Sequence, residues 1–215
     1  FYRGEVAEKC VRCSRKLGGT FTMRDFETHV SEWVDPIKIS YRGHEVYQLP
    51  PATQGFVTLQ MLKILEGYDL GSLEHNGSEY LHLFIEAKKH AFADREMYLA
   101  DRESMSVSCE ALLSEERVAA MRDGLRTGRA AVNVATVPVP GDTEYIAVAD
   151  GWGNRVSFIQ SLFMGFGSGI VVEDTGIVLQ NRGHMFNLDP GWLLAWSHMS
   201  RAIRRIVFLL MPGLI

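Results

Sequence analysis

Residues Gly141 to Ser161 read G-D-T-E-Y-I-A-V-A-D-G-W-G-N-R-V-S-F-I-Q-S. Two β-favouring runs flank the turn-forming sequence D-G-W-G-N, so the stretch predicts a β-hairpin. Just upstream, the sequence T-V-P-V-P from Thr136 to Pro140 is extended, because proline keeps it out of a helix. An exposed linker therefore leads into a Gly-Asp-Thr step, in which Thr143 is the first residue of a buried strand.

Thr143 would carry a free α-amine if the peptide bond between Asp142 and Thr143 were cut. An amine of this kind, with an ordinary pKa of about 8, can act as general base for the hydroxyl of its own residue. The alternative is a β-branched residue in a favourable strand position, and from the residues alone this alternative is the commoner one.

The hairpin sequence and the following F-G-S-G-I-V-V-E-D-T-G-I-V-L-Q-N-R-G resemble the γ-glutamyltransferase (γ-glutamyltranspeptidase) family around its self-cleavage site. Upstream, F-Y-R-G-E, L-G-G-T-F-T-M-R-D-F, L-P-P-A-T-Q-G and H-L-F-I-E-A-K-K-H-A-F-A-D-R occur in the order of that family. These motifs cover residues 1 to 191. The resemblance implies an α+β fold, the four-layer αββα sandwich of the N-terminal-nucleophile hydrolases, with part of both sheets outside this chain.

The same resemblance implies an internal fragment of a self-processing precursor. Residues 1–142 would be the C-terminal part of a large-subunit segment, and residues 143–215 the N-terminal part of a small-subunit segment, within one structural domain. Thr143 would be the nucleophile twice, first on the carbonyl of Asp142 and then on a substrate amide, through an acyl-enzyme. Ser161 stands where the family has a hydroxyl that hydrogen-bonds the nucleophile, and Glu144 stands where many relatives have a second Thr.

The expected substrate is a small-molecule amide with a γ-glutamyl or glutaryl acyl group, bound by Asn181 and Arg182. True transpeptidases have an acidic residue where this chain has Met185, and that acid pairs with the substrate α-ammonium. An arginine favours a carboxylate instead. The sequence N-R-G followed by Phe186 is similar to the acylase-like branch, which includes cephalosporin (glutaryl) acylases. Hydrolysis of an acyl group that bears a carboxylate is therefore favoured over transpeptidation of glutathione, with no cofactor and no metal.

Two alternatives stay open. The chain could be an inactive fragment or pseudoenzyme of this family, or a non-catalytic α+β binding protein in which Thr143 is only a strand residue. The net charge of −4 and pI of about 6.0 give no basic footprint for nucleic acid. No apolar stretch is long enough to span a membrane, and the three cysteines do not indicate a compartment.

Three further patterns could carry chemistry. Cys10 and Cys13 form C-x-x-C, but no second pair completes a zinc set. His82, Glu86 and His90 share a helix face, yet the H-E-x-x-H order is absent, so solvated or salt-bridged residues are the favoured interpretation. The Gly165–Gly169 loop precedes a strand-like run rather than a helix, which argues against a phosphate cradle.

Hydrophobic periodicity and capping residues predict the remaining elements. Thr22, Thr53 and Ser114 are candidate N-caps, and Arg42-Gly43 is the turn of a second hairpin. The Ala93–Arg95 sequence A-D-R is interpreted as a structural ion pair. Expected helices are 4–17, a short one containing Phe26, one from Thr53 to Gly67, 78–100 and 114–121; expected strands are the pair within 37–49, then 143–149, 155–163, 169–173 and 176–180. Expected on the buried side of the long helix are Leu81, Phe84, Ile85, Phe92, Met97 and Leu99.

Residues 192 to 209 lose the family pattern, and Met211 to Ile215 regain it. Two compensating reading-frame shifts would produce such a segment, and translation of the same DNA in its other two frames tests this hypothesis. The alternative is a divergent segment in which Trp192 and Trp196 are candidates for a partner surface.

Overall fold

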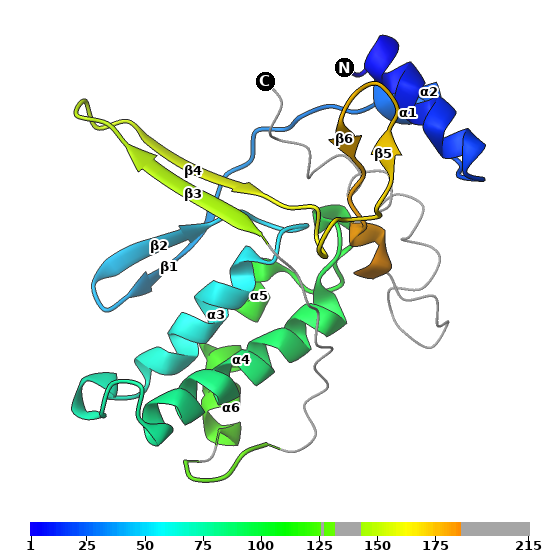
Figure 1. Cartoon of the computed structure of the whole chain (residues 1–215). Helices are drawn as coiled ribbons and strands as arrows, with labels where there is room; N and C mark the ends of the chain where they lie inside the picture. The colour runs from blue at the N-terminus through cyan, green and yellow to red at the C-terminus, as the bar shows by residue number, and fades with distance from the viewer. Residues whose placement is uncertain (126, 132–142, 186–215) are drawn as a thin grey trace. The chain divides into compact units, whose positions relative to one another are not determined.

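The computed structural model describes residues 1–125, 127–131 and 143–185 (Figure 1). Within the chain two compact units are distinguished, one formed by Phe1–Glu32 with Pro138–Ile215 and the other by Trp33–Val137. Asp142, the segment 192–209 and the stretch regained at 211–215 lie outside the described residues, so the expectations for them are not addressed by the fold.

The unit Trp33–Val137 begins with a β-hairpin and continues as a small helical bundle. Its hairpin turns at Arg42 and Gly43, with φ of 48° and 82°, the left-handed conformation that a two-residue hairpin turn requires. The expected hairpin is therefore confirmed. In chain order the elements are β1 (Ile37–Tyr41), β2 (His44–Gln48), α3 (Gly55–Glu66), η1 (Leu70–Ser72), α4 (Ser78–Tyr98), η2 (Arg102–Ser104), α5 (Cys109–Leu112) and α6 (Glu115–Gly124).

Helix α3 is the centre of this unit, since it contacts α4, α5, α6 and both strands of the hairpin (Figure 1). Two apolar clusters line its opposite ends. One cluster joins Ile64 and Leu65 of α3 to α4 and α6, and the other joins Phe56 and Val57 to Ala91 and α5. Helix α3 ends where expected, but its N-cap is Gln54 rather than Thr53, whose hydroxyl donates to the carbonyl of Leu49 at 2.9 Å.

The predicted buried face of α4 is partly wrong. Leu81, Ile85 and Met97 are 44–52% exposed. The face that is buried carries Leu83, Ala87 and Ala91, followed by charged residues, because small alanine side chains let α3 approach closely and the charged residues find partners there. Phe84, Phe92 and Leu99 are partly buried against the apolar clusters, as expected.

Asp94 is the buried charge that joins three helices. Its carboxylate accepts a hydrogen bond from Gln60 Nε2 at 2.8 Å and is paired with the Arg117 guanidinium. Gln60 Nε2 also donates to the carbonyl of Leu112, at 2.8 Å. The expected structural ion pair therefore exists, but its partner is Arg117 of α6 rather than the neighbouring Arg95, which pairs with Glu96. A buried carboxylate is tolerated only with such partners.

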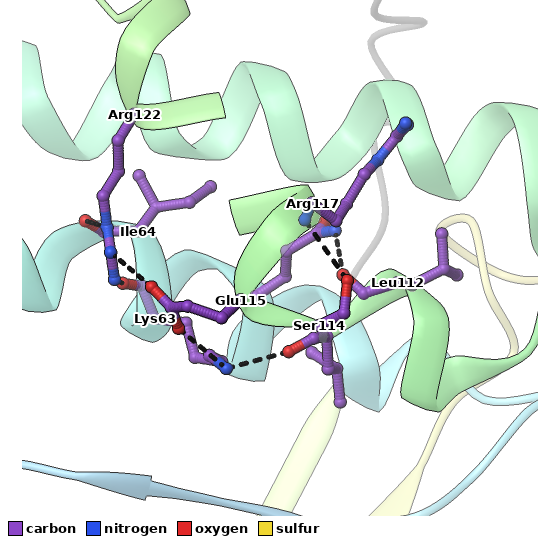
Figure 2. Close-up of polar contacts among 9 residues, drawn as sticks. Lys63, Ile64, Leu112, Ser114, Glu115, Arg117 and Arg122 are labelled. Carbon is purple, nitrogen blue, oxygen red and sulfur yellow. Dashed lines mark hydrogen bonds and ion pairs between the residues drawn. The ribbon is translucent and has the colours of Figure 1, made fainter. Parts of the chain in front are cut away.

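The C-terminal end of α3 is satisfied by side chains from α6 (Figure 2). Arg122 Nε donates to the carbonyl of Ile64 at 3.3 Å, and its Nη1 donates to Glu115 at 2.7 Å. Lys63 in turn donates to the carbonyl of Leu113 at 2.8 Å. The last carbonyls of a helix lack intrahelical donors, so Arg122 stabilises the end of α3, and Lys63 of α3 likewise satisfies the carbonyl of Leu113 at the end of α5. Ser114 caps α6 as predicted, its Oγ accepting from the N–H of Arg117 at 3.2 Å.

The other unit contains α1 (Glu5–Lys16), α2 (Met23–Glu27), β3 (Glu144–Ala149), β4 (Arg155–Gln160), β5 (Val171–Val172), β6 (Ile177–Val178) and η3 (Arg182–Met185). Its apolar core joins α1 and α2 to the β5–β6 pair, with Cys10, Phe26 and Val172 at the centre. Thr22 starts α2 as predicted, because the Asp25 carboxylate accepts from the Thr22 backbone N–H at 2.8 Å. β5 and β6 are shorter than the expected strands.

β3 and β4 form the predicted antiparallel hairpin (Figure 1). Its turn is held by the Asp150 carboxylate, which accepts from the backbone N–H groups of Trp152 and Asn154, each at 2.9 Å. The expectation that β3 is buried is wrong for this chain, since every residue of β3 is exposed. A two-stranded hairpin cannot cover either of its own faces, and a further layer is needed to bury them.

Candidate active site

The hairpin register places Thr143 and Ser161 opposite each other. Glu144 at the start of β3 pairs with Gln160 at the end of β4, so the residues one step outside this pair face each other as well. The Thr143 hydroxyl donates a hydrogen bond to Ser161 Oγ at 3.0 Å. Thr143 is exposed and Ser161 is half-buried. The two hydroxyl residues that sequence reasoning paired are thus brought into direct contact.

Ser161 Oγ also accepts the backbone N–H of Phe163, at 2.8 Å. The Ser161 oxygen therefore accepts hydrogen bonds from Thr143, just before β3, and from Phe163, just after β4. These two bonds fix the position of the Ser161 hydroxyl relative to Thr143. A hydroxyl held in this way can orient a neighbouring nucleophile and can exchange a proton with it.

Asn181 forms two hydrogen bonds with the segment that follows Ser161. Its backbone N–H donates to the carbonyl of Leu162 at 3.2 Å, and its side-chain Oδ1 accepts the backbone N–H of Met164 at 3.1 Å. The predicted substrate-binding role of Asn181 is not tested by these contacts. They do show that the backbone N–H and the side-chain Oδ1 of Asn181 together hold the segment 162–164 in place.

Arg182 lies at the start of η3, directly after Asn181. Its backbone N–H donates to the side chain of Gln180, and its guanidinium carbon lies 4.8 Å from the centroid of the Phe163 ring. Arg182 is partly buried, and burial lowers the pKa of its guanidinium. Even so, an arginine stays charged at neutral pH. The structure therefore assembles Thr143, Ser161, Asn181 and Arg182 along one continuous set of contacts that passes through residues 162–164.

The glycine-rich loop after Phe163 is structural. Gly167 has a φ of +63°, and a Cβ there would lie 2.6 Å from the carbonyl oxygen of Leu179. The backbone N–H groups of Gly167, Ser168 and Gly169 donate to the carbonyls of Met164, Leu179 and Phe166. Because these donors are engaged within the protein, the loop does not present them to a phosphate.

The other patterns singled out in the sequence do not form a metal centre. Among the described residues, no group of three or more His, Cys, Asp or Glu side chains is placed to hold a metal ion. Glu86 is buried and pairs with Lys89 at 2.6 Å, as the salt-bridge interpretation predicts. It also accepts the backbone N–H of Ala131 at 3.0 Å. None of the helices in the described part of the chain is long and apolar enough to cross a membrane.

Phe163 is the residue of this site that sequence reasoning missed. It adopts a φ of +83°, which is rare for a bulky side chain. Nothing in the sequence signals that conformation, since a phenylalanine before a glycine-rich loop is ordinarily an apolar loop residue. Only the three-dimensional structure reveals that its N–H, its neighbours and its ring each contact a different predicted site residue.

Comparison with known proteins identifies the family. Residues 1–203 match the family model described as gamma-glutamyltranspeptidase, so the chain belongs to that family. The match extends into the segment 192–209, whose frame-shift interpretation stays a hypothesis.

Among curated relatives, the glutathione hydrolase-like YwrD proenzyme of Bacillus subtilis is 43% identical over 189 residues, covering 88% of this chain and 36% of the relative. The oxamate amidohydrolase proenzyme of Klebsiella pneumoniae is 36% identical over 195 residues, covering 91% of this chain and 36% of the relative. The chain thus spans about a third of the length of these relatives.

Among solved structures, cephalosporin acylase from Bacillus halodurans superposes with a TM-score of 0.76 at 42% identity, over 92% of this chain and 36% of that one. The expected fold class is therefore confirmed. The chain is α+β and contains part of the fold of the N-terminal-nucleophile hydrolases.

Proposed function

We propose that this chain is part of a self-processing enzyme that transfers or hydrolyses an acyl group from a small-molecule amide, with Thr143 as its N-terminal nucleophile. The observation that carries the proposal is the 3.0 Å hydrogen bond between the Thr143 and Ser161 hydroxyls, at the first residue of a hairpin, in a member of the gamma-glutamyltranspeptidase family. An exposed Thr that merely favours a β-strand does not need a hydroxyl partner on the adjoining strand.

In the precursor, the Thr143 oxygen would attack the carbonyl carbon of Asp142. The bond from that carbon to the Thr143 nitrogen breaks, the nitrogen takes the hydroxyl proton, and an ester links the two residues. Water then hydrolyses the ester and leaves Asp142 as a carboxylate and Thr143 with a free amine. Cleavage here would yield a large-subunit segment ending at residue 142 and a small-subunit segment starting at Thr143.

In the mature enzyme, the same hydroxyl would attack the substrate amide, with the Thr143 amine accepting its proton and passing it to the leaving amine. Water or an acceptor amine would then cleave the acyl-enzyme ester and release the acyl group. Ser161 would orient the hydroxyl through the observed hydrogen bond.

The acyl group is proposed to be of the γ-glutamyl or glutaryl type, with its carboxylate at Arg182. Support comes from the charge and partial burial of Arg182, and from the names of relatives, which include an acylase and an amidohydrolase. The remaining alternatives are an inactive fragment or pseudoenzyme and a non-catalytic binding protein.

Self-cleavage is the decisive test. The protein is expressed from the complete reading frame that encodes this chain, and its fragments are measured by mass spectrometry. The wild type should give one fragment that begins at Thr143. Thr143→Ala should remain uncut because it lacks a nucleophile, and Thr143→Ser should cut slowly.

The matched control is Thr58→Ala, on the exposed side of α3, which should be cut like the wild type. Efficient cleavage of the Thr143→Ala variant before residue 143 would rule out the nucleophile assignment. An uncut but folded wild type would favour the two alternatives.

A further inference from the structure

Within residues 1–125, 127–131 and 143–185, the guanidinium of Arg182 contacts an aromatic ring and no acid. Its Nε is buried and has no hydrogen-bond partner among the described residues. Burial lowers the pKa of Arg182, and no described carboxylate counteracts that effect. A carboxylate ligand would supply the charge balance and the hydrogen bonds that burial removes. Arg182 is therefore placed as a binding group for an anion.

The ring beneath Arg182 belongs to a residue whose backbone is held in an unfavourable conformation. Phe163 has a φ of +83°, a region that bulky residues rarely occupy. The Phe163 N–H donates to Ser161 Oγ at 2.8 Å, and the Phe163 ring centroid lies 4.8 Å from the Arg182 guanidinium carbon. One residue thus contacts both the hydroxyl pair and the anion-binding group.

The residues on either side of Phe163 are fixed as well. The carbonyl of Leu162 accepts the N–H of Asn181 at 3.2 Å, and the N–H of Met164 donates to Asn181 Oδ1 at 3.1 Å. The Phe163 backbone is therefore bonded to Ser161 through its own N–H. Both of its neighbours are bonded to Asn181, the residue that precedes Arg182. Such a short, doubly tethered segment restricts where the ring can lie.

We infer that Phe163 is a positioning residue, an aromatic platform that sets the Arg182 guanidinium at a fixed place relative to the Thr143 hydroxyl and thereby selects acyl groups that end in a carboxylate. A guanidinium over an aromatic face is attracted by the ring and loses part of its freedom to rotate. The inference rests on the proposed function, because it names how the same site would choose its substrate.

Glutarate binding tests the platform without requiring turnover. Dissociation constants are measured by isothermal titration calorimetry on the protein from the complete reading frame, with neutral glutaramide as the comparison ligand. Arg182→Ala should weaken glutarate roughly tenfold or more. Phe163→Leu should weaken it roughly three- to tenfold, the scale of a cation–π contact, and Phe163→Tyr should bind within about twofold of the wild type because it keeps the ring. Glutaramide binding should be unchanged in each variant.

Two controls separate a positioning role from general disruption. Phe166→Leu is the same substitution in the adjoining loop, at a side chain that is 87% exposed, and should leave glutarate affinity unchanged. The double variant Phe163→Leu with Arg182→Ala should bind no more weakly than Arg182→Ala alone, because the ring acts through the guanidinium. In turnover of a glutaryl anilide, Phe163→Leu should raise KM with little change in kcat.

The inference is wrong if Phe163→Leu binds glutarate as tightly as the wild type, if Phe163→Tyr fails to restore affinity, or if glutaramide binding falls equally. It is also wrong if Arg182→Ala leaves glutarate affinity unchanged. Failure of the proposed function looks different, because the wild type would then neither cut itself before Thr143 nor hydrolyse the anilide. The titrations would still decide whether Phe163 sets the anion affinity of Arg182.

Discussion

At the scale of single residues, the three thiols of the chain lie in different environments. Cys10 and Cys109 are buried, and Cys13 is partly exposed on the same helix as Cys10. Burial raises the pKa of the Cys109 thiol to about 11 and raises the pKa of Cys10 as well. A thiolate is the reactive form of cysteine, so both burial and a raised pKa protect Cys10 and Cys109.

We predict that iodoacetamide at pH 8 labels Cys13 first in the folded chain. With a pKa of about 11, only about one Cys109 side chain in a thousand is ionised at that pH. Peptide mass spectrometry over a time course measures the order of labelling, and guanidinium chloride should make all three cysteines react alike. Labelling of Cys109 as fast as Cys13 in the native chain would contradict the buried position of Cys109.

The residues of the candidate site were predictable where the sequence resembles a known family. Ser161 was paired with Thr143 because the family has, at that position, a hydroxyl that hydrogen-bonds the nucleophile, and the register of the hairpin explains why the two residues face each other. The contact between Arg182 and Phe163 could not be predicted, because it depends on a positive φ at Phe163 and on the side-chain bonds of Asn181. Neither feature has a period or a composition that a sequence displays.

At the scale of helices, the side-chain network around Asp94 links α3, α4 and α6. We predict that Asp94→Ala lowers the free energy of unfolding by about 1–3 kcal/mol, because it leaves Arg117 and Gln60 without the acceptor that they share. Urea denaturation of the 215-residue chain, followed by far-ultraviolet circular dichroism, measures the change.

The control for this prediction is Asp123→Ala, the same substitution at an exposed position in α6. It should change the free energy of unfolding by no more than about 0.5 kcal/mol. Equal effects of the two substitutions would mean that the Asp94 network does not stabilise the helices beyond any other acid on their surface.

The helix ends were predictable and the orientation of the long helix was not. Gly67 and Ser114 mark ends because backbone conformation and capping are local properties. The buried face of α4 depends on what packs against it, and there Glu86 and Asp94 are buried while Leu81 is exposed. Ion pairs with Lys89 and Arg117 offset the cost of burying the Glu86 and Asp94 carboxylates. Neither pairing could be inferred from apolar spacing alone.

At the scale of the whole molecule, paired carboxylates make stability depend on pH. Burial by itself raises the pKa of Glu86, but hydrogen bonds from Lys89 and from the N–H of Ala131 outweigh it, so the pKa is lowered. The hydrogen bond from Arg122, together with Lys63, lowers the pKa of Glu115. A carboxylate whose pKa is lower in the folded state stabilises the fold above its unfolded pKa, and this contribution is lost as pH falls through the folded value.

We predict that the thermal midpoint of the chain is highest above pH 5 and falls steadily from about pH 4.5 to pH 2.5, as these acids take up protons. Glu86→Gln should lower the midpoint at pH 6 and weaken its dependence on pH, because it removes one of the titrating groups. Differential scanning calorimetry at several pH values provides the measurement. A midpoint that rises on acidification would show that the pairs do not stabilise the folded chain.

We expect the hairpin of β3 and β4 to affect how the chain behaves at high concentration. Its exposed apolar side chains include Ile146 and Val148 on one strand and Val156 and Ile159 on the other. An uncovered apolar ribbon is a template on which another extended segment can add, which is how intermolecular β-aggregates begin. The colloidal behaviour of this polypeptide during synthesis and storage thus depends on how soon another segment or layer shields the exposed faces of β3 and β4.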